Sequence, residues 1–230
     1  MAPPLGDPEQ APGSPPPHMN KADILNRIRT EKVIALIRAD GPGSLVECAR
    51  ALAEGGLRTI ELTMTTPGAI ELVAAASREL PEVMLGLGTV LDPDTAKAGL
   101  DAGARFIVTP GVRPEVIRAC QRLGAPVLSG AFTPTEIAYA ADLGADLIKI
   151  FPAEFFGPPY IKSLRAVFPT LSFMPTGGVT TKTVGEFLKA GAFATAAGSA
   201  LVDPVALKSK DWAALTARAR EFAAAAAAAV

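Results

Sequence analysis

Histidine and cysteine are scarce in this chain of 230 residues, which contains one histidine, His18, and two cysteines, Cys48 and Cys120. A zinc or transition-metal site of the usual His/Cys kind needs more ligands than these residues supply, although carboxylates alone could still bind magnesium. The cysteines show no CxxC spacing, so we expect reduced core thiols and a cytoplasmic protein. Acid–base chemistry must then fall to carboxylates, lysine, tyrosine or water.

A strong net charge and long apolar runs are also missing. The formal net charge is −1, the isoelectric point is about 5.9 and no basic stripe is present, so we expect no nucleic acid partner. No apolar run approaches the roughly 18–20 residues of a membrane-spanning helix, so we expect no membrane partner. With 49% hydrophobic residues, the composition suits one globular domain with a large core.

The two ends of the chain differ from the rest in composition. Residues 1–19, "MAPPLGDPEQAPGSPPPHM", are rich in proline and poor in large apolar side chains, which predicts an extended or disordered segment. The other end, "EFAAAAAAAV", predicts a helical tail that frays. Residues 20–230 are therefore expected to form the folded domain.

Between the ends, a short apolar run followed by a helix-length segment recurs along the chain. Proline, Asp, Ser or Thr marks the helix starts and glycine turns mark the helix ends. The predicted strands are 33–38, 58–63, 83–89, 105–110, 126–132, 146–152, 171–178 and 193–199. This order predicts an α/β fold, a single (β/α)8 TIM barrel with an extra N-terminal helix at 20–31 that closes its bottom. An open doubly wound sheet is the alternative, weakened because no GxGxxG follows the first strand.

In such barrels, catalytic residues lie at the C-terminal ends of the strands. The polar and glycine residues that end the predicted strands are Arg38, Glu61, Thr63, Thr89, Thr109, Ser129, Lys149, Thr176, Gly177, Gly178 and Ser199. One lysine, one carboxylate and two glycine-rich turns make this set chemically informative.

Lys149 lies in the middle of an apolar strand, "ADLIKIFPAE". A lysine ammonium is rarely buried without a partner, because it loses its hydration. Strand side chains alternate, so Lys149 shares one face with Leu147 and Phe151, and we expect that face to point into the barrel. Apolar surroundings favour a neutral amine, which is the form that attacks a carbonyl to make a Schiff base. Near Lys149, Glu61 could transfer protons. The alternative is that the two residues form an ion pair with a structural role only.

Two glycine turns, "PTGGVT" and "AAGSAL", follow the seventh and eighth predicted strands. Glycine lets backbone N–H groups approach an anion closely, and the helix that follows adds its dipole. Either turn alone also fits a simple tight turn. Together, at the strand ends where phosphate commonly binds in these barrels, they predict a phosphate site.

With these features in place, the chain resembles the 2-keto-3-deoxy-6-phosphogluconate (KDPG) aldolases, a family that includes 4-hydroxy-2-oxoglutarate and 6-phosphogalactonate aldolases. The resemblance covers about residues 21–220, in the motifs "GGLRTIELT", "GLGTVLDP", "IVTPGV", "LIKIFPAE", "FGPPYIKSL", "PTGGV" and "GSALV". It implies a class I aldolase that needs no metal or cofactor, forms a homotrimer and acts on a 2-keto acid sugar phosphate in the cytoplasm.

The resemblance also implies roles for individual residues. Lys149 matches the Schiff-base lysine, and Glu61 matches the carboxylate that moves protons through a bound water. The implied binding residues are Thr89 for the pyruvoyl carboxylate, Pro110 and Phe151 for apolar walls, and Gly177, Gly178 and Ser199 for the phosphate.

The chain departs from the family pattern at the second strand. Many members read Glu-x-Thr-x-Arg there, and the arginine binds the substrate carboxylate, whereas this chain reads "ELTMT" with Thr65 in the arginine's place. We expect Arg38, at the end of the first strand, to take over this role. The alternative is that Arg38 pairs with Asp40 on the rim.

The preferred substrate depends on one residue of the seventh strand end. KDPG-type members resemble this chain in the threonine of "PTGGV", Thr176, which predicts KDPG as the substrate. "KIFP" and "FGPPYIKSL" also resemble the galactonate type, so 2-keto-3-deoxy-6-phosphogalactonate and 4-hydroxy-2-oxoglutarate stay alternatives. Two further alternatives are a phosphate-binding barrel isomerase, which would not need Lys149, and a non-catalytic trimeric scaffold.

Overall fold

The computed structural model describes residues 19–38 and 45–229. The strands are β1 (Val33–Ile37), β2 (Thr59–Thr63), β3 (Met84–Gly88), β4 (Phe106–Val108), β5 (Val127–Ala131), β6 (Leu147–Ile150), β7 (Phe173–Pro175) and β8 (Thr195–Ala197). The α-helices are α1 (Lys21–Glu31), α2 (Leu45–Glu54), α3 (Ala69–Glu79), α4 (Pro93–Asp101), α5 (Pro114–Arg122), α6 (Pro134–Asp142), α7 (Gly157–Val167), α8 (Val184–Lys189), α9 (Pro204–Ser209) and α10 (Trp212–Ala227), with a 3-10 turn η1 (Ala153–Phe155). Each predicted strand run therefore contains one observed strand.

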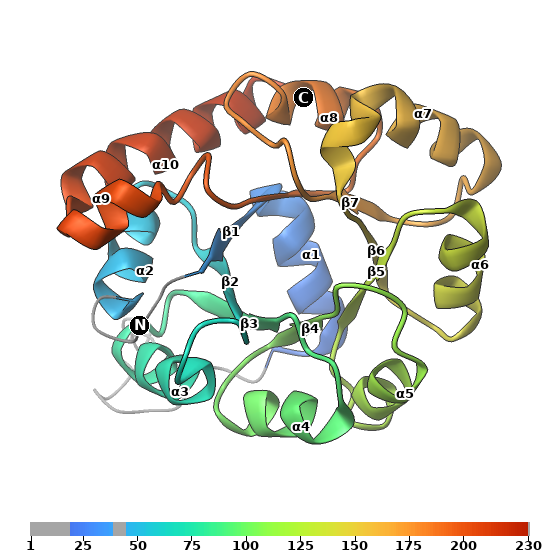
Figure 1. The fold of residues 1–230 in the computed structure, drawn as a ribbon, viewed down its shortest axis with the longest axis horizontal. Coiled ribbons are helices and arrows are strands. Elements are labelled where there is room, and N and C mark those ends of the chain that lie inside the picture. The colour runs from blue at the N-terminus through green and yellow to red at the C-terminus, as the bar shows by residue number, and fades with distance from the viewer. Residues whose placement is uncertain (1–18, 39–44, 230) are drawn as a thin grey trace, which may run out of the picture.

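The strands form one parallel sheet with the order β7-β6-β5-β4-β3-β2-β1-β8. Its two ends meet, because Thr176 bridges to Ala196 and the N–H of Phe193 donates to the carbonyl of Phe173 at 2.8 Å. Helices surround the sheet, and α1 crosses one end of it (Figure 1). The prediction of a (β/α)8 barrel is confirmed, and the alternative of an open doubly wound sheet is wrong.

Strand alternation divides the core into two parts. One set of strand residues packs outward against the helices, and the other set fills the lower interior of the barrel. The inner set with its helix partners is Ile24, Ile28, Ile34, Met84, Phe106, Val108, Leu128, Leu147, Met174, Ala194 and Ala196. Because apolar side chains occupy the lower interior, the upper interior is the place left for a polar site.

Helix α1 closes the bottom as predicted. Its start is fixed by a capping box in which Asn20 and Asp23 exchange side-chain to backbone hydrogen bonds. At its end, Glu31 accepts a hydrogen bond of 2.7 Å from the hydroxyl of Thr59, the first residue of β2. Met19, the last residue of the segment predicted to be disordered, packs against the inner core cluster, and residues 1–18 lie outside the described range.

The alanine-rich C-terminal segment is an ordered helix rather than the frayed tail that the composition predicted. Phe222 and Ala226 of α10 are buried, and the hydroxyl of Thr216 donates to the carbonyl of Ala51 in α2 at 2.9 Å. Glycine directly after α2 lets this helix approach α10 closely, since a Cβ on Gly55 would collide with Ala219. Small side chains here therefore serve packing against α2.

Candidate active site

Lys149 and Glu61 meet inside the upper barrel from opposite strands, β6 and β2. The Nζ atom of Lys149 lies 3.6 Å from Oε1 of Glu61, and the side chains are 7% and 0% exposed. Neither carboxylate oxygen of Glu61 has a hydrogen-bond partner in the described part of the protein. A buried carboxylate with unused acceptors beside an amine suits proton transfer to and from a bound molecule.

Glycines on the neighbouring strand make room for this carboxylate. Gly88, at the end of β3, faces Glu61, and a Cβ built on Gly88 would overlap the carboxylate. Gly86 is the register partner of Glu61 and lies against the ring of Phe106. The sequence reasoning missed Gly88, although the alternating glycines of "GLG" beside a strand with an inward carboxylate were a usable signal.

The walls beside Lys149 are apolar. Phe151 follows β6, and its ring centroid lies 5.7 Å from Nζ of Lys149. Gly130 is the register partner of Lys149, and its missing side chain lets the backbone of Pro110 approach. Phe151 therefore lies beside the lysine, and the backbone of Pro110 lies against the strand residue paired with it; their role as the walls of a substrate pocket stays a prediction.

Thr89 directly follows β3 and has an unusual backbone conformation. Its φ is 60°, a left-handed value that is rare for β-branched residues. Such a conformation costs on the order of 1–3 kcal/mol and tends to occur at functional sites. This strain could not be predicted from the sequence, because threonine has no preference for the left-handed region.

Arg38 follows β1 and continues the alternation of Ile34, which belongs to the inner core cluster. Its side chain is exposed at the upper rim of the barrel. This placement fits the expected reach toward the barrel mouth. The alternative partner, Asp40, lies outside the described residues.

The end of β2, where the resemblance predicted an arginine, contains a pair of hydroxyl groups. The side chains of Thr63 and Thr65 lie 2.7 Å apart, Oγ1 to Oγ1, at the end of β2. Thr63 is fully buried, so this pair ends the polar row that begins with Thr59 and Glu61 on the same strand face. The pair provides hydroxyls but no positive charge at the end of this strand.

Thr176 lies at the closure of the barrel, between β7 and β8. Its side chain is 5% exposed, and its hydroxyl has no hydrogen-bond partner within the described residues. Its backbone is fixed, since its N–H donates to the carbonyl of Ile150 and its carbonyl accepts from the N–H of Ala153, both at 2.9 Å. A buried, unused hydroxyl on a rigid backbone is suited to contact with a ligand.

The glycine turn after β7 is tightly built. Gly177 and Gly178 have φ of 96° and 68°, and both approach Glu154, an exposed residue of η1. The next helix, α8, begins only at Val184, so the expected contribution of a helix dipole at the glycines is wrong. Ser199 is exposed in the turn after β8. The sequence reasoning missed Glu154, whose contact with the glycines is visible only in three dimensions.

Two of the nominated strand-end residues do not face the interior. Val108 and Leu128 belong to the inner cluster, so their neighbours Thr109 and Ser129 fall on the helix-facing side. The hydroxyl of Thr109 accepts from the N–H of Gly130 at 3.3 Å, and Ser129 is fully buried. Both hydroxyls therefore belong to the wall of the barrel, and their nomination is wrong.

Comparison with known proteins places this arrangement in a family. A model of the KDPG and KHG aldolase family matches residues 24–218. The chain belongs to this family. A 2-dehydro-3-deoxy-phosphogluconate aldolase of Treponema pallidum (strain Nichols) is 35% identical over 196 residues, covering 85% of this chain and 92% of that protein.

Two solved structures of similar proteins share the fold of this aldolase-family chain. KDPG aldolase from Legionella pneumophila, with pyruvate captured as a covalent carbinolamine intermediate, has a TM-score of 0.81 and 29% identity, covering 89% of this chain and 98% of that one. Native KDPGal has a TM-score of 0.80 and 31% identity, with coverage of 86% and 95%. The predicted family resemblance is confirmed.

Three further features of this aldolase-family chain concern metal ligands, membrane-spanning helices and cysteines. Within residues 19–38 and 45–229, no three His, Cys, Asp or Glu side chains gather into a possible metal site. In the same ranges, no helix combines the length and the apolar character needed to span a bilayer. Cys48 and Cys120 are unpaired and buried, and burial raises the pKa of the two thiols to about 12 and about 11.

Proposed function

We propose that this chain is a class I aldolase that cleaves KDPG to pyruvate and glyceraldehyde 3-phosphate. The observation that carries the proposal is the buried Lys149–Glu61 pair, with 3.6 Å between Nζ and Oε1 and no other partner for the carboxylate in the described residues. The named activity of relatives such as the Treponema pallidum aldolase supports it. An isomerase or a scaffold would not require a lysine at this depth.

The reaction begins with covalent attachment. Glu61 accepts a proton from Lys149, and the neutral amine adds to the C2 carbonyl of the sugar acid to give a carbinolamine. Loss of water from the carbinolamine gives an iminium, with the proton for the departing hydroxyl supplied by Glu61. The iminium carries the positive charge that later withdraws electrons from the C3–C4 bond.

Bond cleavage then uses the same carboxylate. Glu61, acting through one water, removes the proton from the C4 hydroxyl, and the C3–C4 electron pair moves into the iminium to form an enamine. Glyceraldehyde 3-phosphate leaves as the C4 hydroxyl becomes an aldehyde. Protonation of the enamine at C3 and hydrolysis of the resulting iminium release pyruvate and return Lys149.

The ends of the substrate are bound by groups on either side of this pair. Thr89 and Arg38 bind the carboxylate, with Arg38 supplying the positive charge that Thr65 cannot. Phe151 and Pro110 form the apolar walls around the reacting carbons. Gly177, Gly178 and Ser199 bind the phosphate through backbone N–H groups and one hydroxyl.

Thr176 favours KDPG over its galactonate epimer in this proposal. Its buried hydroxyl has no partner within the described residues, so a substrate hydroxyl in the correct configuration would satisfy both groups. An unpaired buried polar group costs about 1–3 kcal/mol, which corresponds to roughly tenfold or more in specificity. 4-Hydroxy-2-oxoglutarate, which has no phosphate, would lack the contacts at the glycine turn.

We also propose that the enzyme is metal-independent, cytoplasmic and trimeric. The iminium performs the electron withdrawal that a metal performs in other aldolases, and the unpaired cysteines fit a reducing compartment. An exposed aromatic surface supports self-association: Phe155 and Phe156 are 72% and 59% exposed, and Phe156 stacks on Phe132. Light scattering of the purified protein should give the mass of three chains, and a monomer would contradict this assignment.

Borohydride trapping tests the proposed chemistry. The protein is incubated with pyruvate, reduced and weighed, and the modified peptide is identified by mass spectrometry. We expect one reduced pyruvate per chain, attached to Lys149, and no adduct in a Lys149→Met variant. Adduct formation without KDPG cleavage would retain the Schiff base but refute the substrate; absence of any adduct would refute the class I mechanism.

A further inference from the structure

A cationic pocket lies at the end of the barrel opposite the catalytic pair. Arg29 and Lys32 come from the end of α1, just before β1, while Ser172 and Phe193 precede β7 and β8. All of these residues therefore lie at the N-terminal ends of the strands, whereas Lys149 and Glu61 are near the C-terminal ends. The pocket has a volume of about 410 Å³, within the usual range for small-molecule sites.

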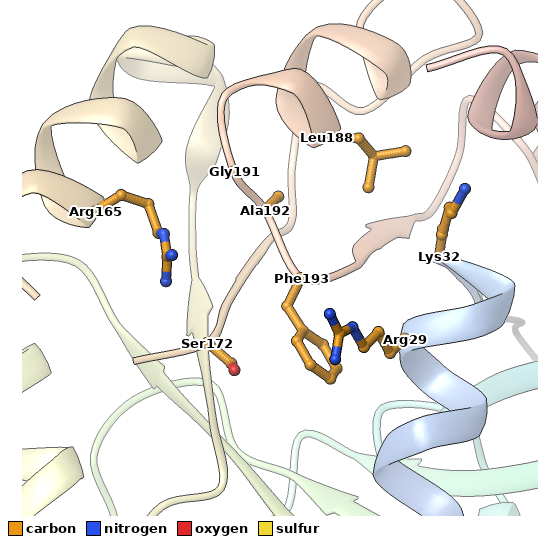
Figure 2. A pocket seen from close by; sticks show the side chains of 8 residues that line it. All are labelled: Arg29, Lys32, Arg165, Ser172, Leu188, Gly191, Ala192 and Phe193. Atoms are coloured by element: carbon orange, nitrogen blue, oxygen red, sulfur yellow. The ribbon is translucent and has the colours of Figure 1, made fainter. Parts of the chain in front are cut away.

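Three positive side chains line this pocket: Arg29, Lys32 and Arg165. Figure 2 shows Arg165 entering from α7 and Arg29 from α1, with Ser172 and Phe193 between them in this view. No carboxylate lines the pocket, and in the described ranges none of the three cations forms an ion pair. Their charge is therefore not neutralised by the protein parts that the structure describes.

Arg165 is held in place before any ligand arrives. Its Nη1 donates to the carbonyl of Leu171 at 2.9 Å, and its side chain passes over Gly191, where a Cβ would come within 3.2 Å of Cγ. Gly191 also has a φ of 99°, which favours glycine. A guanidinium fixed by one hydrogen bond keeps further N–H donors for an anion.

The backbone of Lys32 is fixed on the other side. Its carbonyl accepts hydrogen bonds from the N–H and the hydroxyl of Thr195, at 2.8 and 3.1 Å. The rest of the lining includes Leu188 and Phe193, which provide apolar surface between the positive groups. The pocket thus combines separated cations with an apolar wall.

A simpler role for two of these cations is to stabilise helix ends. Arg29 and Arg165 each lie in the last turn of a helix, where the helix dipole favours a positive charge. That role accounts for each arginine separately. It does not account for the presence of these two arginines and Lys32 in the lining of one pocket whose lining includes no carboxylate.

We propose that this pocket is a second binding site, for a small organic polyanion with two separated anionic groups on a short carbon skeleton. One group binds Arg165 and Ser172, and the other binds Arg29 and Lys32, while the skeleton contacts Leu188 and Phe193. The anionic groups are phosphates or carboxylates, which share this chemistry. The site does not depend on the proposed aldolase activity.

Isothermal titration of the full-length protein tests the site with two probes, fructose 1,6-bisphosphate and citrate, and with uncharged fructose as a control. We work first at about 0.01 M ionic strength, where the screening length is about 30 Å, and then at about 0.15 M, where it is about 8 Å. We expect at least one polyanion to bind with a dissociation constant of about 1 mM or tighter. The bisphosphate and citrate arms distinguish a phosphate site from a carboxylate site, and binding of neither would refute the proposal.

Matched arginine variants locate the binding. Arg165→Ala and Arg29→Ala should each weaken binding by about 10- to 100-fold, whereas Arg122→Ala, an exposed arginine at the end of α5, should leave it unchanged. The side chain of Arg29 has no hydrogen bond or ion pair within the described residues, so its variant should fold even if Arg165→Ala is destabilised. Equal affinities in Arg29→Ala and wild type would place the anion elsewhere, including at the glycine turn above the catalytic pair, and would overturn the proposal.

Discussion

Replacement of Gly88 by alanine should inactivate the enzyme although neither Lys149 nor Glu61, the two proposed catalytic residues, is replaced. A Cβ at position 88 would overlap the Glu61 carboxylate, while the backbone of Gly88 is ordinary β-strand that alanine can adopt. The new methyl group therefore has to push the carboxylate out of its position 3.6 Å from Lys149. Gly88→Ala therefore moves the Glu61 carboxylate but leaves its chemical nature unchanged.

The magnitude follows from the role proposed for the carboxylate. General acid–base catalysis contributes roughly 10²- to 10⁴-fold, and a displacement of about 1 Å can cost roughly 10²-fold. We expect kcat/KM for KDPG cleavage, followed by coupled reduction of the released pyruvate, to fall by at least about 100-fold. Overpacking should lower the free energy of unfolding by only about 1–3 kcal/mol, so the variant should remain folded at room temperature.

Two controls make this prediction specific. Gly185→Ala, in α8, adds the same methyl group where the nearest side-chain atom is 3.5 Å away, and it should keep full activity. In a Glu61→Ala background, Gly88→Ala should cause little further loss, because the carboxylate that it displaces is already gone. Retention of wild-type activity by Gly88→Ala, or an equal loss in both backgrounds, would refute the reasoning.

Four further results are expected. Lys149→Ala should lose all measurable cleavage and should melt at a lower temperature than the wild type, because it leaves Glu61 buried without its cation. The double variant Lys149→Met/Glu61→Gln should regain the melting temperature of the wild type but not its activity. Arg38→Ala should raise KM by about 10- to 100-fold with a smaller change in kcat, and an unchanged KM would make Arg38 a rim residue. Thr176→Val should reduce the ratio of kcat/KM for KDPG to that for the galactonate epimer by about tenfold, and an unaltered ratio would remove Thr176 from substrate selection. Activity should survive EDTA, and a loss reversed by added metal would contradict the proposed electron sink.

The sequence was sufficient to predict the barrel and the position of Lys149 and Glu61 inside it. Each strand is an apolar run between a glycine turn and a helix cap. These local patterns predict the strands correctly because the same apolar residues pack against the helices in the folded protein. Lys149 and Glu61 were visible because charges within apolar strands violate the usual pattern. The inward direction of Lys149 followed from alternation alone.

Other features needed the three-dimensional structure. Thr109 and Ser129 end predicted strands and are therefore candidate site residues. In the structure they alternate with the inward-facing Val108 and Leu128, so their side chains face the helices. The close approach of Glu154 to the glycine turn joins residues more than 20 positions apart. The composition of the C-terminal alanines does not reveal that Gly56, in the turn after α2, leaves room for Ala223 of α10.

The Lys149–Glu61 pair also connects the two halves of the chain. Glu61 belongs to β2 and Lys149 to β6, strands that lie four places apart in a ring of eight. The first four strands alone contain the carboxylate without the amine, and the last four contain the amine without the carboxylate. If this pair performs the chemistry proposed above, neither half-barrel should be active by itself. During refolding, activity should therefore return only when the two halves dock, after most of the helical structure has formed. When fragments that correspond to the two halves are mixed, enzymatic turnover should appear only once they have assembled.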